Sequence, residues 1–421
     1  MKTRTTLATF DNDATGCFDR VPCTVAMLAS RRLGASSCMC QMQADTLQNI
    51  QHQLRTAFRL SSESYYSSHD FEIHGQGQGS RAGPPTWVFV SSLLLDCMEK
   101  LTTGVSFTCP NQQIQHQRHN DAFVDDVTGY ANKFLDELQG TNVLNQVTRT
   151  MQKDAATWNE LLQISGGKLA LQKCLYYIIS WQWTNGIATT VPPEQIQPKI
   201  HLRTDTEYSP ITHLPCHQAH RTLGQMKAPV GNNEDQLLHM SKRSNSWLSA
   251  IKEASLSRME ARAAYESIWF PSISYGLGST NLQRKQLDKL QGSVLQHILP
   301  SLGYNRHFPR AAVFGSIKLG GLHLKNLYTE QGILHILYFI KHYRHYQSIG
   351  KLLHISLRWT RLILGLSYCP LLRPSPDLHH IVDPWFRTLI TFLHEATLAL
   401  KRTINLLYYA DIMIVVSLKT L

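Results

Sequence analysis

Several features that mark secreted, membrane and metal-stabilised proteins are missing from this 421-residue sequence. The N-terminal stretch MKTRTTLATF contains no apolar core of a signal peptide. The longest apolar stretch, residues 404–418, falls short of the ~20 residues of a membrane-spanning helix and includes Asp411. The nine cysteines show neither disulfide-framework spacing nor the paired CxxC spacing of a zinc module. We therefore expect an intracellular protein, cytoplasmic or nuclear, with reduced thiols and no membrane partner.

Acidic residues are also in short supply. Asp and Glu number 30 against 41 Lys and Arg, which gives a formal net charge of +11. Such an excess favours a polyanionic partner, and nucleic acid is the first candidate. The charge alone fits a basic protein without such a partner equally well. Hydrophobic residues at 43% and charged residues at 17% are typical of a globular chain with a sizeable core.

Hydrophobic periodicity gives the two halves of the chain different characters. Residues 5–13 are typical of a strand that ends in acidic residues, and residues 122–132 of a strand, a tight turn and a second strand. Between them, we expect helices over residues 21–60 and a buried, largely apolar helix over residues 86–101. From about residue 233 onward, apolar residues at helix-like spacing predict a helical domain.

Two neighbouring carboxylates, Asp125 and Asp126, interrupt the apolar stretch AFVDDVTGYAN at residues 122–132. A turn between two strands would place both at an exposed tip, where their repulsion is relieved when a divalent cation binds. A solvated turn is the alternative reading. That alternative loses weight because the stretch FDNDATGCFDRV supplies a further carboxylate, Asp13, at another strand end, with a glycine-rich loop between the two.

Five stretches resemble motifs A to E of reverse transcriptases, which are RNA-directed DNA polymerases, and especially those of non-LTR retrotransposons. They are DATGCFDRV, GQGQGSRAGPPTWVFVSSLL, AFVDDVTGYAN, GGKLALQKCLYYIISW and RTLG, in that order along the chain. Their order and spacing both agree with the family, whereas any one of them alone would be a weak match. One departure is AGPP, where the family has Ser-Pro after the glutamine loop.

The resemblance implies an α+β fold with the right-hand palm of polymerases, an antiparallel sheet of three or four strands backed by helices. The palm would cover residues 1–231, a mainly helical thumb-like region residues 232–364, and a tail of unassigned role residues 365–421. The family's basic fingers segment does not precede motif A, so we expect an N-terminally truncated element. We expect the chain by itself to bind nucleic acid with steep salt dependence and to extend primers little.

The resemblance also assigns metal ligands. Asp13 falls at the metal-binding position of motif A, and Asp125 at that of motif C. Together they would hold two Mg²⁺ (or Mn²⁺) ions, one activating the primer 3′-hydroxyl and the other neutralising the triphosphate. Asp126 is the second carboxylate of motif C and a less constant ligand. The carbonyl of Ala14 would add an oxygen.

Nucleotide contacts follow from the same comparison. Phe18 falls at the steric-gate position, where a ring excludes a 2′-hydroxyl; a core aromatic is the alternative. Gln78 and Gly79 would line the nucleotide pocket, with glycine allowing close backbone approach. Arg81 is a candidate triphosphate contact. Lys173 resembles the motif D lysine, a proton donor to pyrophosphate, and a surface lysine is the alternative.

The implied partners are an RNA template, a DNA primer and deoxynucleoside triphosphates. In the helical half, Lys242, Arg243, Lys252, Arg258 and Arg262 would contact phosphates, unless they form a merely solvated basic face. Two other functions stay open: a catalytically inactive retroelement remnant that at most binds nucleic acid, and an RNA-directed RNA polymerase. FVDD and Phe18 favour the DNA-making enzyme over the RNA-making one.

Overall fold

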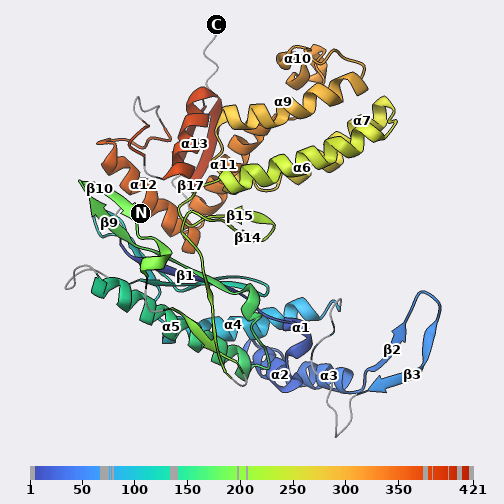
Figure 1. Cartoon of the computed structure of the whole chain (residues 1–421), viewed down its shortest axis with the longest axis vertical. Helices are drawn as coiled ribbons and strands as arrows, with labels where there is room; N and C mark the ends of the chain where they lie inside the picture. The colour runs from blue at the N-terminus through green and yellow to red at the C-terminus, as the bar shows by residue number, and fades with distance from the viewer. Residues whose placement is uncertain are drawn as a thin grey trace. The chain divides into compact units, whose positions relative to one another are not determined.

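The computed structural model describes residues 5–66, 75, 77, 80–132, 141–196, 199–204, 207–372, 378–381, 383–396, 398–404 and 410–416. These residues form a mixed α and β structure that divides into two compact units (Figure 1). The sheet unit comprises Thr3–Ser106 and Gln117–Pro215, and the helical unit comprises Phe107–His116 and Cys216–Leu421. The predicted division at residue 231 stays a prediction, and each unit is described by itself.

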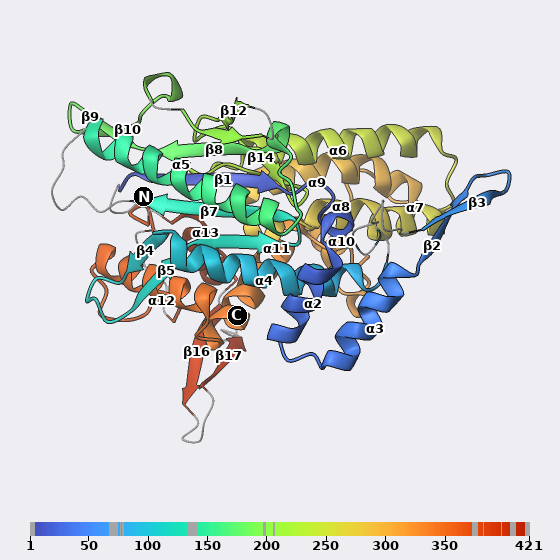
Figure 2. The same cartoon turned by 90° about the horizontal axis from the view of Figure 1, so that it is seen from below.

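A five-stranded, mostly antiparallel sheet organises the sheet unit. Its order is β13 (Thr212–His213), β8 (Leu175–Ile179), β1 (Leu7–Asp13), β7 (Asp126–Asn132) and β6 (Asn120–Phe123). The antiparallel sheet agrees with the prediction, but its size differs from the three or four strands expected. The difference is β13, a two-residue strand that pairs in parallel with β8. Strand β1 lies at the centre, between β7 and β8 (Figure 2).

Helices bury one stripe each against this sheet. Helix α5 (Thr141–Ile164) packs on β1 and β7, and α4 (Gly83–Leu101) packs on α5 and α2 (Cys23–Arg32). The helix expected over residues 86–101 is present as α4, but it is buried on one side only, because Val88 is 58% exposed. Only a stripe at helical spacing is buried, namely Thr86, Trp87, Val90, Leu94 and Met98.

The expected helices over residues 21–60 are correct only in part. Helices α2 and α3 (Ser37–Gln48) are present, but β2 (Gln51–Arg55) and β3 (Leu60–Tyr66) form a hairpin instead of a helix. Leu54 continues the helix-like spacing of the preceding apolar residues, yet its side chain is 65% exposed. The chain forms a turn here instead of a helix, and the Thr56 amide closes it by donating to the Arg59 carbonyl.

The remaining elements of the sheet unit are short. They are α1 (Cys17–Arg20), the 3₁₀ turn Leu171–Lys173, β9 (Trp181–Thr184), β10 (Ile187–Thr190), β11 (His201–Arg203) and β12 (Tyr208–Pro210). Strands β4 (Val105–Thr108) and β5 (Gln115–Arg118) form a separate two-stranded sheet.

The helical half predicted after residue 233 is present as helices from Glu234 onward. Helix α11 (Leu327–Arg344) is central to the helical unit and contacts α9 (Arg284–Ser301), α12 (Ser348–Ile363) and α13 (Pro384–Glu395). The other elements are β14 (His220–Thr222), β15 (Gln225–Lys227), α6 (Glu234–Glu253), α7 (Arg258–Ala264), α8 (Phe270–Ser274), α10 (Arg310–Phe314), β16 (Leu398–Ile404) and β17 (Ala410–Val416).

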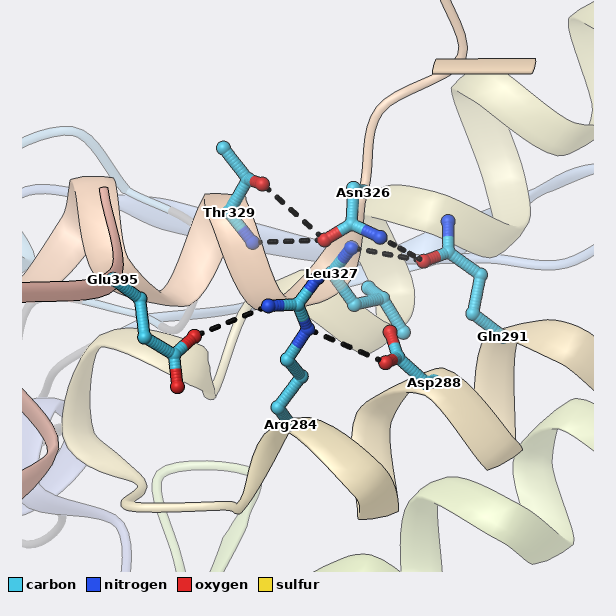
Figure 3. Close-up of polar contacts among 7 residues, drawn as sticks. All are labelled: Arg284, Asp288, Gln291, Asn326, Leu327, Thr329 and Glu395. Atoms are coloured by element: carbon cyan, nitrogen blue, oxygen red, sulfur yellow. Dashed lines mark hydrogen bonds and ion pairs between the residues drawn. The ribbon is translucent and has the colours of Figure 1, made fainter. Parts of the chain in front are cut away.

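A polar network fixes the start of α11 against its neighbours (Figure 3). Asn326 caps the helix by accepting a 2.9 Å hydrogen bond from the Thr329 amide, and Gln291 of α9 accepts one of 2.9 Å from the Leu327 amide. Arg284 donates to Glu395 of α13 at 3.2 Å. Apolar burial stabilises the packing of these helices, and the polar contacts fix their orientation relative to one another. Among the described helices, none combines the length and hydropathy needed to cross a membrane.

Candidate active site

Two carboxylates meet where the central strands of the sheet unit end. Strand β1 ends at Asp13, which pairs with Asp126 at the start of β7, and Asp125 occupies the turn just before. The Asp125 carboxyl lies within hydrogen-bonding reach of Asp13. Burial, and then the negative charge of Asp13, raise the pKa of Asp125. Two carboxylates this close repel each other, and a cation beside them would relieve that repulsion.

Lys173 lies directly on this acidic pair. Its Nζ is 2.5 Å from Asp13 Oδ2, and the hydrogen bond to Asp13 raises the Lys173 pKa. The charges of Asp125 and Asp126 add to that rise. The turn that carries Lys173 is joined to β1, because the Ala170 amide donates to the Asp13 carbonyl at 2.9 Å and the Lys173 amide donates to the Ala170 carbonyl at 2.8 Å. The structure thus places the Lys173 ammonium at the acidic pair, and its role as a proton donor stays a prediction.

The turn that presents Asp125 is strained and buttressed. Val124 has a φ of 58°, which is rare for a β-branched residue and costs on the order of 1–3 kcal/mol. The Trp87 indole of α4 donates to the Val124 carbonyl at 2.5 Å, and the Ala14 amide donates to the Asp125 carbonyl at 3.4 Å. The sequence reasoning missed Trp87. The signal in the sequence was a tryptophan within an apolar helix, because a buried indole N–H needs a hydrogen-bond acceptor nearby.

Phe18 is half-buried on α1 and packs against the core of the sheet unit. The glycine-rich loop begins beside it. A Cβ on Gly75, whose φ is 88°, would come within 2.4 Å of the Asp19 backbone. The Gly75 amide also donates to the Val21 carbonyl at 3.1 Å. This close approach requires glycine at residue 75 and joins the loop to the helix that bears Phe18.

Other predicted nucleotide contacts are less well placed by the structure. Gln78 and Gly79 lie outside the described residues. Arg81 is exposed in the turn just before α4. Cys17, one residue before Phe18, has its pKa raised to about 12 by burial and by the charge of Asp125, so its thiol stays protonated.

A divalent ion such as Mg²⁺ needs several oxygen ligands. Across the described part of the chain, no three His, Cys, Asp or Glu side chains converge in an arrangement that could hold a metal. Asp13 and Asp125 are in contact, Asp126 is the cross-strand partner of Asp13, and Ala14 is buried beside them. Mg²⁺ is commonly held by one or two carboxylates plus substrate phosphates. The pair fits an ion whose coordination the substrate completes.

The predicted basic residues of the helical unit fall into two groups. Lys242, Arg243 and Lys252 are exposed on α6. Arg262 instead pairs with Glu266 at 3.0 Å and donates to the Leu322 carbonyl at 3.0 Å, and the Arg258 guanidinium lies against Gly303. The sequence reasoning also missed residues 289–329, which contain five Lys and Arg and no Asp or Glu.

No protein-family model matches the sequence, and no curated protein matches it. Among solved structures, the chain is similar to telomerase from Candida tropicalis in complex with the TWJ fragment of telomeric RNA, with a TM-score of 0.32 and 10% identity over 84% of this chain and 50% of that chain. Telomerase from Candida albicans, in the corresponding complex, gives 0.23 and 10% over 83% and 49%. This chain spans about half the length of the telomerase chains it matches. The proposals below rest on the chain's own residues.

Proposed function

We propose that the chain carries the palm and a thumb-like region of a non-LTR retrotransposon reverse transcriptase, an RNA-directed DNA polymerase. The observation that supports this most is the contact between Asp13 and Asp125, which the paired ends of β1 and β7 bring together from motifs far apart in sequence. Lys173, from a third motif, completes the cluster. A chance acidic turn would not gather residues from three motifs in the family's order.

The cluster suits nucleotidyl transfer to a primer 3′-hydroxyl. Mg²⁺, when bound, would lower the pKa of that hydroxyl and neutralise the triphosphate. Asp13 and Asp125 would hold the ion as carboxylates, and the ion's charge would oppose the rise that burial gives the Asp125 pKa. The hydrogen bond to Asp13 favours the protonated form of Lys173, which would give a proton to the leaving pyrophosphate. Phe18, beside the glycine loop, would exclude a 2′-hydroxyl.

Phosphate contacts are the second requirement, for an RNA template and a DNA primer. Residues 289–329 form a long segment without a carboxylate, and Lys242, Arg243 and Lys252 are exposed on α6. Lys and Arg that neutralise phosphates release counterions, so binding would be independent of sequence and would weaken steeply with salt.

Primer extension on an RNA template, with a DNA primer, deoxynucleotides and Mg²⁺, tests the proposal. The variants are Asp125→Asn and a matched control, Asp19→Asn, because Asp19 is an exposed carboxylate on the neighbouring α1. Extension that Asp125→Asn abolishes and Asp19→Asn preserves is the expected pattern. Because the chain alone is expected to extend slowly, Mn²⁺ binding is followed in parallel by electron paramagnetic resonance.

Mn²⁺ binding that depends on Asp125 but not on Asp19 supports the proposed metal site at Asp13 and Asp125, even when extension is slow. Salt-sensitive nucleic-acid binding with neither extension nor Asp125-dependent Mn²⁺ binding would overturn the polymerase proposal. That outcome would instead indicate an inactive remnant that binds nucleic acid.

A further inference from the structure

The β2–β3 hairpin, residues 51–66, is an arm that contributes nothing to the cores of the described residues. None of its side chains belongs to a buried apolar cluster there. Both views show it reaching away from the sheet and helices of its own unit (Figures 1 and 2). Apolar and aromatic side chains are nevertheless exposed along it, namely Leu54, Phe58, Leu60, Tyr65 and Tyr66. Their exposure is not explained by folding of this unit.

Phe58 at the tip is the extreme case, with 97% of its surface exposed. The turn that carries it is held in one conformation. The Thr56 amide donates to the Arg59 carbonyl at 3.0 Å, and the Thr56 hydroxyl accepts from the amides of Phe58 and Arg59 at 3.2 Å each. The ring is therefore presented on a preorganised turn, which lowers the entropy lost when a partner binds.

The charges beside the ring identify the kind of partner. Arg55 and Arg59 flank the turn, are exposed, and form no ion pair with any residue the structure describes. An aromatic face with adjacent guanidinium groups matches a nucleobase with adjacent phosphates. A duplex keeps its bases stacked on one another, whereas a single strand offers a free base face.

We propose that the tip of this arm binds single-stranded nucleic acid, with Phe58 stacked on an unpaired base and Arg55 and Arg59 on the flanking phosphates. That this strand is the RNA template rests on the proposed function, whereas the stacking contact itself does not. The contact is outside the acidic cluster and needs neither metal nor nucleotide.

Fluorescence anisotropy with a labelled, unstructured RNA of about 16 nucleotides measures the contact in EDTA. Phe58→Ala should weaken binding about 5- to 150-fold, the range found for stacked bases, and Phe58→Trp should preserve it. The control is Tyr208→Ala, because Tyr208 is another exposed aromatic of the same unit at 69% exposure. Since Phe58 is almost fully exposed, its truncation does not threaten folding.

Replacing Arg55 and Arg59 together with Gln should reduce the slope of log K against log salt by about 0.7 for each lost phosphate contact. Single-stranded DNA of the same sequence decides whether the strand must be RNA, and duplex of the same sequence should show little effect of Phe58→Ala. The assay contains EDTA and no nucleotide, so it measures this contact independently of the metal ligands and of primer extension, which separates this proposal from the polymerase proposal.

Three results would overturn the inference. One is equal binding by Phe58→Ala and the unmutated chain. Another is an equal loss on duplex and on single strands. The last is unchanged RNA affinity of Phe58→Ala together with a changed elution volume in size-exclusion chromatography. That combination would indicate that the arm joins two copies of the chain instead of binding RNA.

Discussion

Replacing Asp154 with Asn should stabilise the sheet unit at neutral pH and leave its stability unchanged in acid. Asp154 lies on α5, is 6% exposed, and its Oδ2 has no hydrogen-bond partner among the described residues. It lines a cavity of about 10 Å³ behind β1 and β7, together with Asn12, Asn120 and Trp158. Burial raises the Asp154 pKa from 3.8 to about 6.

The direction of the pH effect follows from proton linkage. The folded state keeps the Asp154 proton to higher pH than the unfolded state does, so stability falls as pH rises from about 4 to about 6. The shift corresponds to about 3 kcal/mol, and screening by nearby solvent lowers the expected loss to about 2 kcal/mol. Asn carries no charge and escapes this loss.

Urea unfolding of both proteins at about pH 4 and about pH 8 measures the effect. The difference in unfolding free energy should be near zero at the lower pH and favour Asp154→Asn by about 2 kcal/mol at the higher. Glu160→Gln, on the exposed face of the same helix, is the matched control and should show no such pH dependence. An Asp154→Asn difference that is the same at both pH values would refute the buried-charge reasoning.

Other predictions concern the acidic cluster. In any form of the chain that extends primers, Phe18→Ala should raise ribonucleotide incorporation relative to deoxynucleotides, and an unchanged ratio would remove the steric-gate role. Lys173→Gln should tighten Mn²⁺ binding, because the Lys173 ammonium contacts Asp13 and would compete with the ion for that carboxylate. The same variant should lower the maximal extension rate. Weaker Mn²⁺ binding would contradict the competition between Lys173 and the ion. Val124→Asn should raise the unfolding free energy by about 1 kcal/mol, since Asn tolerates positive φ. Urea unfolding measures this, and a less stable variant would show that the backbone at residue 124 is not strained.

The acidic turn could be predicted from sequence because its signals are local. Alternating apolar residues on either side of Asp125 and Asp126 indicate two strands and a turn, and the structure has β6, the turn and β7 there. Its pairing with β1 is not local. The comparison with polymerase motifs placed Asp13 opposite this turn, and the strand register agrees with that placement.

Long-range contacts could not be read from the sequence. The bond from Trp87 to Val124 joins residues 37 positions apart, and no local pattern specifies it. The β2–β3 hairpin was mistaken for helix because Leu54 happens to continue a helical spacing, whereas the deciding interaction is the Thr56 hydrogen-bond set in the turn. In both cases a side chain that satisfies backbone groups outweighs hydrophobic periodicity.

Charge compensation explains how an acidic pair can stand at the end of two largely buried strands. Asp13, Asp125 and Asp126 lie close together, and the ammonium of Lys173, which contacts Asp13, offsets part of their repulsion. The Lys173 side chain is 65% exposed, so its ammonium can move away from Asp13. Under the proposed function, a divalent cation that arrives with the nucleotide would take the place of this ammonium beside the carboxylates.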